Sequence, residues 1–190
     1  MKRPAGDGGA FLFSALGLRP AMRYAGGVFR RERMGRMSTV YLFDPGLLMR
    51  GERYHDSHLA DVCRAVEPAT TEGRLWFLAA SDCPALAPGE ARVAGELFAV
   101  DESSLSRLDY LYGYVAGQPR QSEFVRRQIE AATASGETRL AWAYFIRAET
   151  LREKFPGAEE IPAGDWRAFV AARLNDETPE TTAADIVEYE

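Results

Sequence analysis

The chain has 190 residues, of which 46% are hydrophobic and 27% are charged, and these proportions are typical of a globular protein with a single main domain. A net charge of −5 excludes the general attraction to nucleic acid and anionic membranes that a basic protein has. No apolar run approaches the ~20 residues of a membrane-spanning helix. Cys63 and Cys83 offer neither a disulfide framework nor metal-ligand spacing. We therefore expect a cytoplasmic protein without a metal or other cofactor.

The two ends of the chain differ in charge from the middle. Residues 1–36 are rich in glycine and arginine, whereas residues 176–190 hold six acids and no base. We interpret residues 1–36 as a basic, flexible extension, or as sequence upstream of a natural start at Met37. Residues 175–190 are expected to form an acidic disordered tail. The predicted domain is therefore 37–174.

The first half of this domain alternates strand-like runs with turn signals. Thr39–Phe43 is a buried-strand pattern that ends at Asp44-Pro45-Gly46. Tyr54–Ala65 has the apolar spacing of a helix. Gly73–Leu78 and Arg92–Val100 follow as strands, joined by the turn-rich segment 81–89.

The second half predicts a helix, two strands and a last helix. Asp101 is a plausible N-cap for a helix that continues to Leu111, and Gly113 can end it. Strands are expected at about 124–131 and 138–147, and an amphipathic helix at 166–174. Strands outnumber helices, and few crossover helices separate them. This pattern favours an α+β fold built on a mixed or largely antiparallel curved sheet.

Seven segments, in this order, resemble the gamma-glutamylcyclotransferase-like family over residues 38–174. They are LFDPGLLMRG, TEGRLWFL, CPALAPG, VAGELFAVD, LSRLDYLYGY, LAWAYFI and IPAGDWRAF. The resemblance implies a small mixed or antiparallel β-barrel with peripheral helices. It also implies cyclisation of a gamma-glutamyl amine to 5-oxoproline, with a glutamate as the acid/base and an early Tyr-Gly-Thr/Ser-Leu loop around the substrate.

This chain departs from the family pattern at both of those places. Pro45 stands where the loop tyrosine is expected, and Leu47 where the hydroxyl residue is expected. Neither residue offers a polar group in exchange, since proline has no N–H and leucine no hydroxyl. Tyr112 occupies the position of the glutamate. Because a phenol with a pKa near ~10 is about three units from neutrality, ~4 kcal/mol opposes its use as a base. A tyrosine still donates a hydrogen bond without that cost.

Three side chains are therefore candidate catalytic groups: Tyr112, Asp44 and Glu96. Tyr112 is either a donor to the substrate or a packed ring that fills the former carboxylate space. Asp44 is either a base with a raised pKa or a turn-initiating aspartate before Pro-Gly. Glu96 is either a displaced catalytic acid or a structural acid at a strand end. The expected substrate-binding residues are Pro45, Gly46, Leu47, Leu48, Pro84, Trp142 and Tyr144.

Other reactive residues have weaker patterns. His55 and His58 lie on one helix face, but no further ligands accompany them, so a proton-shuttle role is favoured over metal binding. Cys83 has no identifiable activating partner.

The sequence leaves three functions open. The first is an enzyme converted to acid/base-assisted cyclisation or addition–elimination on a small, fairly apolar molecule, as in specialised metabolism. The second is ordinary gamma-glutamyl cyclotransfer with Glu96, Asp109 or Asp44 as a substitute carboxylate. The third is a non-catalytic binding protein. Because both polar features of the site are lost together, the first and third functions are favoured.

The expected partner is a small-molecule substrate, with no nucleic acid and no membrane, and the chain is expected to be a monomer or homodimer.

Overall fold

The structure, a computed structural model, describes residues 38–176. The predicted basic extension lies outside the described residues, as does the tail beyond Asp176. Asn175 and Asp176, which we assigned to the tail, are the last residues of a helix. The elements in chain order are β1 (Thr39–Asp44), α2 (His55–His58), β2 (Cys63–Leu78), β3 (Cys83–Asp101), η1 (Glu102–Ser104), α3 (Leu105–Leu111), β4 (Phe124–Thr133), β5 (Thr138–Ile146), α4 (Ala148–Lys154), β6 (Glu159–Ile161) and α5 (Trp166–Asp176).

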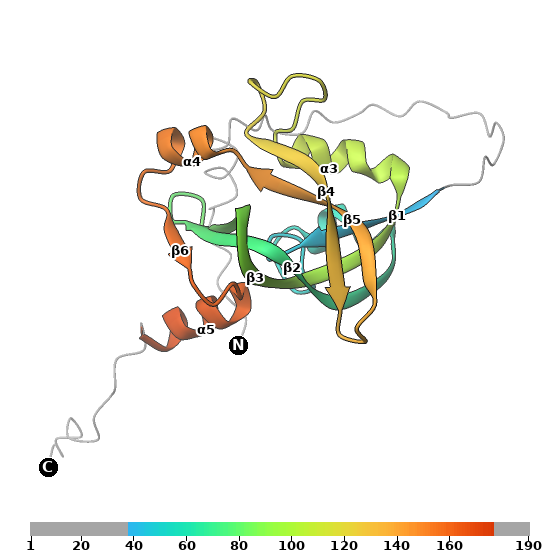
Figure 1. Cartoon of the computed structure of the whole chain (residues 1–190), viewed down its shortest axis with the longest axis horizontal. Helices are drawn as coiled ribbons and strands as arrows, with labels where there is room; N and C mark the ends of the chain where they lie inside the picture. Colours follow the sequence, from blue (N-terminus) through green and yellow to red (C-terminus); the bar gives the residue numbers. More distant parts are fainter. Residues whose placement is uncertain (1–37, 177–190) are drawn as a thin grey trace, which may run out of the picture.

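Five of the strands close into a barrel (Figure 1). Strand β1 pairs with β3 and β5, β3 pairs with β2, β2 pairs with β4, and β4 pairs with β5. The β1–β5 and β3–β5 pairs are parallel and the other pairs are antiparallel. Strand β6 adds to the edge of β2. The predicted small mixed barrel with peripheral helices is therefore confirmed.

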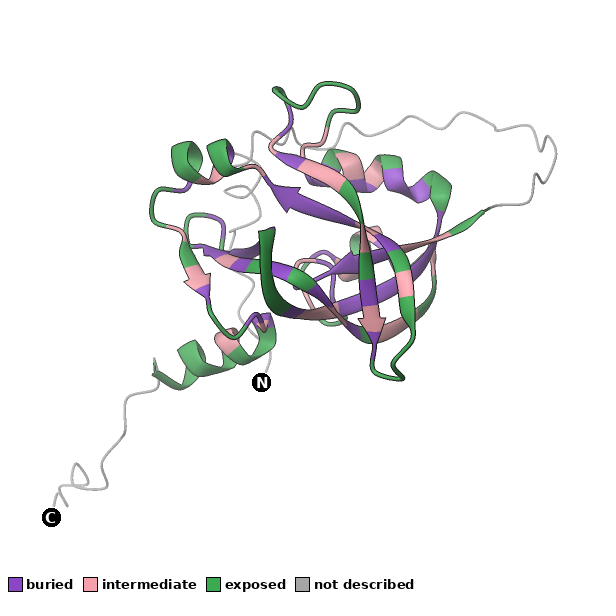
Figure 2. Ribbon diagram, viewed as in Figure 1, coloured by how far each residue is buried: buried purple, intermediate pink, exposed green. Residues whose placement is uncertain are grey.

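Two apolar clusters occupy the two faces of the barrel strands. Neighbouring residues alternate between them, as strand geometry requires: Leu42 belongs to one and Phe43 to the other. The first cluster includes the buried face of α3, at Leu105, Leu108 and Leu111. The second lies on the other face of the strands and also includes Ile161 of β6 and Trp166 of α5. Figure 2 shows the buried positions on the strands beside α3. The barrel wall beneath α3 is thus packed on both sides.

Several predicted elements have different limits. The helix expected over Tyr54–Ala65 is reduced to α2, because the chain turns at Leu59 and joins β2 from Cys63. The turn-rich segment 81–89 is mostly strand β3, and the tight turn is confined to residues 79–82, where Asp82 has φ 48°. The pairing of β2 with β3 explains both the short helix and the long strand, because nearly all residues of β2 are paired with β3.

The central helical segment, η1 followed by α3, begins and ends at the predicted residues, but its start lacks the expected side-chain cap. Gly113 adopts φ 58° directly after α3, the conformation for which glycine is favoured at this position. Asp101 precedes the helical segment, but its side chain makes no capping hydrogen bond. It accepts a hydrogen bond from Arg64 instead. Asp101 therefore occupies the predicted N-cap position without a capping side-chain bond, and the glycine stop is correct.

Candidate active site

Asp44 is the last residue of β1, and the residue is 2% exposed. The Oδ1 atom accepts hydrogen bonds from the N–H groups of Gly46 and Leu48, each at 2.9 Å. This geometry arises locally, because Asp-Pro-Gly reverses the chain and turns the following N–H groups back toward the aspartate. The turn role expected for this residue is present, and it leaves Oδ2 available for another partner.

Tyr112 supplies that partner. It caps the C-terminal end of α3, is buried, and donates a hydrogen bond from its Oη atom to Asp44 Oδ2. The Tyr112 ring stacks on Tyr144 with centroids 4.1 Å apart and an interplanar angle of 7°. The edge of Phe124 packs against the same ring. The two residues therefore form a buried carboxyl–phenol pair, with the phenol fixed between two aromatic rings.

Burial dominates the proton affinities of this pair. It raises the pKa of Asp44, although the hydrogen bonds from Tyr112 and from the N–H groups of Leu48 and Gly46 act in the opposite direction. The nearby charge of Glu96 raises this pKa further. Burial, and then the charge of Asp44, raise the pKa of Tyr112 well above that of an ordinary phenol. Tyr112 is consequently a neutral hydrogen-bond donor, and Asp44 is the group of the pair that can exchange a proton.

A second polar group holds Tyr144 in place. Its Oη donates to Asp109 Oδ1 at 2.7 Å, and Asp109 forms an ion pair with Arg126 at 2.8 Å. Burial raises the pKa of Asp109 against the opposing effects of Tyr144 and Arg126. Asp109, one of the substitute carboxylates considered above, is thus engaged by Tyr144 and Arg126.

Glu96 lies directly across the β1–β3 pair from Asp44, with which it is in register. Its carboxylate accepts a hydrogen bond from the Arg50 N–H at 2.8 Å and pairs with Arg167 at 2.9 Å. These contacts tie the end of the 45–50 loop to β3 and to α5. The arrangement is that of a structural acid, and Glu96 does not line the cavity beside Tyr112.

A small cavity of about 10 Å³ opens beside the Asp44–Tyr112 pair. It brings together six of the predicted site residues, which are Asp44, Pro45, Leu47, Pro84, Tyr112 and Tyr144. Gly46 and Leu48 contribute their N–H groups to Asp44. Trp142 lies elsewhere, under the guanidinium of Arg126. Sequence reasoning missed Ala85, Leu86 and Phe124 in the lining, since no pattern distinguishes them from ordinary core residues.

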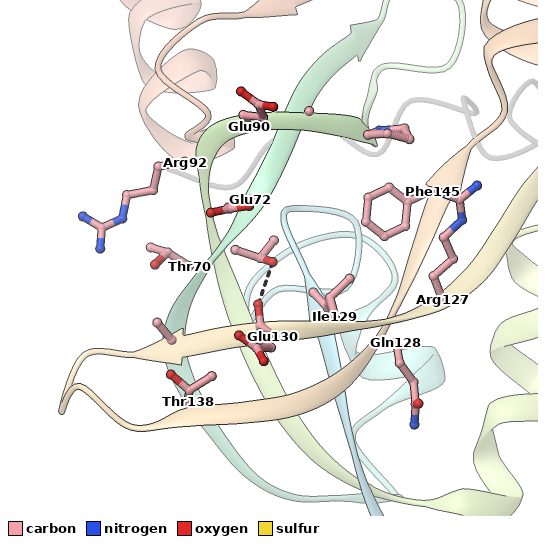
Figure 3. Close-up of a pocket in the computed structure, with 14 residues that line it drawn as sticks. Thr70, Glu72, Glu90, Arg92, Arg127, Gln128, Ile129, Glu130, Thr138 and Phe145 are labelled. Carbon is pink, nitrogen blue, oxygen red and sulfur yellow. Dashed lines mark hydrogen bonds between the residues drawn. The ribbon is translucent and has the colours of Figure 1, made fainter.

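A much larger groove, of about 750 Å³, lies between β2, β3 and β4 (Figure 3). It exists because β2 and β4 pair only at Ala69–Thr133 and Thr70–Ala132, so the two strands separate beyond that point. In Figure 3, Arg92 and Arg127 stand on opposite sides with their guanidinium groups turned away from the groove. The two guanidinium groups are thus not directed into the groove, and the predicted site residues gather in the small cavity instead.

The remaining candidates are occupied elsewhere or shielded. The His55 Nδ1 atom lies 2.9 Å from the Leu48 carbonyl oxygen, and that of His58 lies 2.8 Å from Ser57 Oγ. Burial raises the pKa of the Cys83 thiol to about 12.

Within residues 38–176, no group of three or more histidine, cysteine or acidic side chains is placed to hold a metal ion. In the same part of the chain, no helix is long and apolar enough to cross a membrane.

The closed five-stranded mixed barrel with its peripheral helices defines a protein of the cyclotransferase-like barrel class. The chain belongs to the family described as gamma-glutamyl cyclotransferase, AIG2-like, which it matches over residues 41–168. No curated protein matches the chain.

Solved structures share the fold. YkqA from Bacillus subtilis is 22% identical with a TM-score of 0.54, and the match covers 73% of this chain but only 43% of that one. A protein specific to uropathogenic E. coli is 20% identical with a TM-score of 0.51, covering 71% of this chain and 98% of that one. An AIG2-like protein of Mus musculus is 20% identical with a TM-score of 0.50, and the match covers 64% of this chain and 84% of that one. At these identities the likeness concerns the fold alone.

Proposed function

We propose that this chain is an enzyme of the cyclotransferase type whose acid/base pair is Asp44 and Tyr112, and that it closes a ring in a small, fairly apolar molecule. The observation that carries the proposal is the contact between the buried Asp44 carboxyl, whose pKa is raised, and the Tyr112 phenol. Perturbed groups of this kind are typical of acid/base catalysis. Asp44 thus takes the part that the resemblance gives to a glutamate at position 112.

The reaction can be written with all protons accounted for. As an internal amine or hydroxyl of the substrate attacks a carbonyl carbon, its proton passes to the Asp44 carboxylate. The Tyr112 hydroxyl turns from Asp44 to donate a hydrogen bond to the developing oxyanion, which needs no ionisation of the phenol. When the carbonyl re-forms, the proton on Asp44 passes to the departing amine or hydroxyl. The carboxylate is then regenerated and no cofactor takes part.

The lining of the cavity supports an apolar substrate. Pro45, Leu47 and Pro84 present hydrocarbon where a zwitterionic head group needs polar partners. Because the cavity has room for only about one water molecule, a substrate must displace part of this lining. Leu47 is only partly buried, which makes its side chain the one that can move at the lowest cost.

The proposal is tested with a small-molecule extract of the source cells, incubated with the wild type, Asp44→Asn and Tyr112→Phe and followed by mass spectrometry. We expect one compound to be consumed by the wild type, and its product should have lost water, an alcohol or an amine. Asp44→Asn should abolish the conversion and Tyr112→Phe should slow it at least tenfold. Release of 5-oxoproline from gamma-glutamyl dipeptides at enzymatic rates would instead establish the ordinary reaction.

A second candidate, a non-catalytic binding protein, is favoured by one specific observation. Both oxygens of Asp44 are already hydrogen-bonded, and almost no space remains beside them. In the same experiment, a compound that is retained by the protein but never converted would support this candidate over the enzyme.

A further inference from the structure

The loop after β1 forms an anion-binding arrangement of backbone N–H groups that the chain fills with its own side chain. The N–H groups of Gly46 and Leu48 both point to a single oxygen atom, Asp44 Oδ1, at 2.9 Å. Converging N–H groups of this kind create a local positive potential that favours a carboxylate. The carboxylate bound here comes from two residues earlier in the same chain.

Few other donors remain in this loop. Pro45 has no N–H, the Met49 N–H donates to the Gly46 carbonyl, and the Arg50 N–H donates to Glu96. Within the described chain, the Leu47 N–H has no acceptor, and Leu47 lines the cavity. An incoming molecule therefore finds at most one free N–H in the loop, which suits a single neutral carbonyl oxygen and not a carboxylate.

The charges around the cavity also disfavour the binding of a carboxylate. Glu96 stands in register with Asp44 across the two strands, and the charges of the two carboxylates repel each other. Arg167 neutralises Glu96, but among residues 38–176 the Asp44 carboxylate forms no ion pair and is stabilised by hydrogen bonds. A further carboxylate would add a negative charge to an apolar, nearly closed space.

We propose that Asp44 is a specificity-determining residue that occupies the anion site of the 45–48 loop and thereby excludes substrates that present a carboxylate. The substrate class is therefore a molecule that is uncharged where it meets this loop, with one carbonyl oxygen as its polar contact. The substrate part of this inference rests on the proposed function. The occupied anion site does not, because it can be tested with formate alone.

The test compares the wild type with Asp44→Ala and Asp44→Asn in sodium formate and in sodium chloride of equal ionic strength. In Asp44→Ala the two N–H groups lose their acceptor and a space opens. Formate should therefore produce saturable shifts of the Gly46 and Leu48 amide signals in NMR spectra and raise the melting temperature by several degrees over chloride. Asp44→Asn is the matched control, because its amide oxygen still fills the site. Neither it nor the wild type should respond.

Two results would overturn the inference. One is a formate-dependent shift of the Gly46 and Leu48 amide signals in the wild type, and the other is a folded Asp44→Ala variant in which formate does not shift these two signals. Asp44→Ser serves as a second opened variant if the alanine variant does not fold. If neither opened variant folds, the wild type decides, with shifted amides contradicting the inference and unchanged amides supporting it. Catalysis is not involved in these measurements, so the proposed function can fail while the occupied anion site stands.

Discussion

Tyr112 donates a hydrogen bond to Asp44 across 68 positions of sequence, and it joins the end of α3 to the end of β1. The contact links the two places at which the chain departs from its family's pattern. The sequence comparison places Tyr112 where the family resemblance implies a glutamate, and Asp44 lies just before the altered loop. In the function that we propose, the carboxylate of the site therefore comes from the strand and not from the helix.

Tyr112→Phe removes the only donor to Asp44 Oδ2 among the described residues while keeping the ring between Tyr144 and Phe124. A buried carboxylate oxygen that loses its partner costs about 1–3 kcal/mol in the free energy of unfolding. We expect this loss in urea denaturation at pH 7, and a smaller loss at acid pH, where Asp44 is protonated. Tyr144→Phe, which removes a donor from Asp109, is the matched control. If the loss of stability in Tyr112→Phe is independent of pH, the charge of Asp44 does not contribute to that loss.

The pH dependence of stability should distinguish the wild type from Asp44→Asn. Because the pKa of Asp44 is raised in the folded state, the folded state holds this proton more tightly than the unfolded state does. The wild type therefore loses stability relative to Asp44→Asn as the pH rises from the unfolded pKa, near ~4, through the folded pKa. Each unit of pKa difference contributes about 1.4 kcal/mol. The difference between their unfolding free energies, measured from pH 3.5 to 8, should change in that direction. A constant difference would contradict the raised pKa.

The ion pair of Arg167 with Glu96 should stabilise the loop that carries Pro45 and Leu47. The Glu96 side chain is 9% exposed, and Arg167 also donates to the Arg50 carbonyl oxygen. Arg167→Ala should therefore cost about 1 kcal/mol in the free energy of unfolding, since it leaves a buried acid with one donor fewer. Arg53→Ala, which breaks an exposed pair with Asp82, should cost less. Equal losses in the two variants would mean that the loop does not depend on Glu96.

Sequence patterns located the barrel and much of the candidate site. The strand before Asp44 and the glycine stop after Tyr112 depend on local rules, and both have the expected form in the structure. Leu42 and Phe43 alternate between the two apolar clusters as a strand pattern predicts. These features follow from a few neighbouring residues, which is why they can be read from the chain alone.

The relationships that organise the site depend on distant residues. Nothing in the order of the residues shows that Tyr112 reaches Asp44, that Glu96 is paired with Arg167, or that Trp142 lies under Arg126. The short α2 has the same cause, because pairing of β2 with β3 from Cys63 overrides the helical spacing of that segment. These side-chain contacts and the length of α2 therefore depend on strand pairing across the barrel, which a local sequence pattern does not contain.

The two cysteines should differ in reactivity. Burial raises the pKa of Cys83 to about 12, whereas Cys63 is only partly buried. At pH 8 the thiol of Cys83 is protonated and shielded, so a disulfide reagent should modify one thiol per folded chain and two per unfolded chain. Cys63→Ser should then show no modification until the protein unfolds. Rapid reaction of Cys83 in that folded variant would indicate that the wall near Asp44 opens.

Gly95 determines how closely β3 approaches the start of the loop. A Cβ atom at this position would lie 2.5 Å from the Asp44 carbonyl oxygen and 2.9 Å from the Pro45 Cα. Both of these are backbone atoms, so relief requires β1 and β3 to separate near the candidate site. Gly95→Ala should therefore cost about 1–3 kcal/mol in the free energy of unfolding.

The matched control is Gly157→Ala, because a Cβ atom there meets no atom within 4 Å and its φ lies outside the range that favours glycine. This change should be neutral, or stabilising by about 0.4–1 kcal/mol through the unfolded chain. Gly95→Ala should also shift the amide signals of Gly46 and Leu48, since their acceptor Asp44 moves with its backbone. If Gly95→Ala is as stable as Gly157→Ala and leaves those signals unchanged, the close approach of β3 is not what positions Asp44.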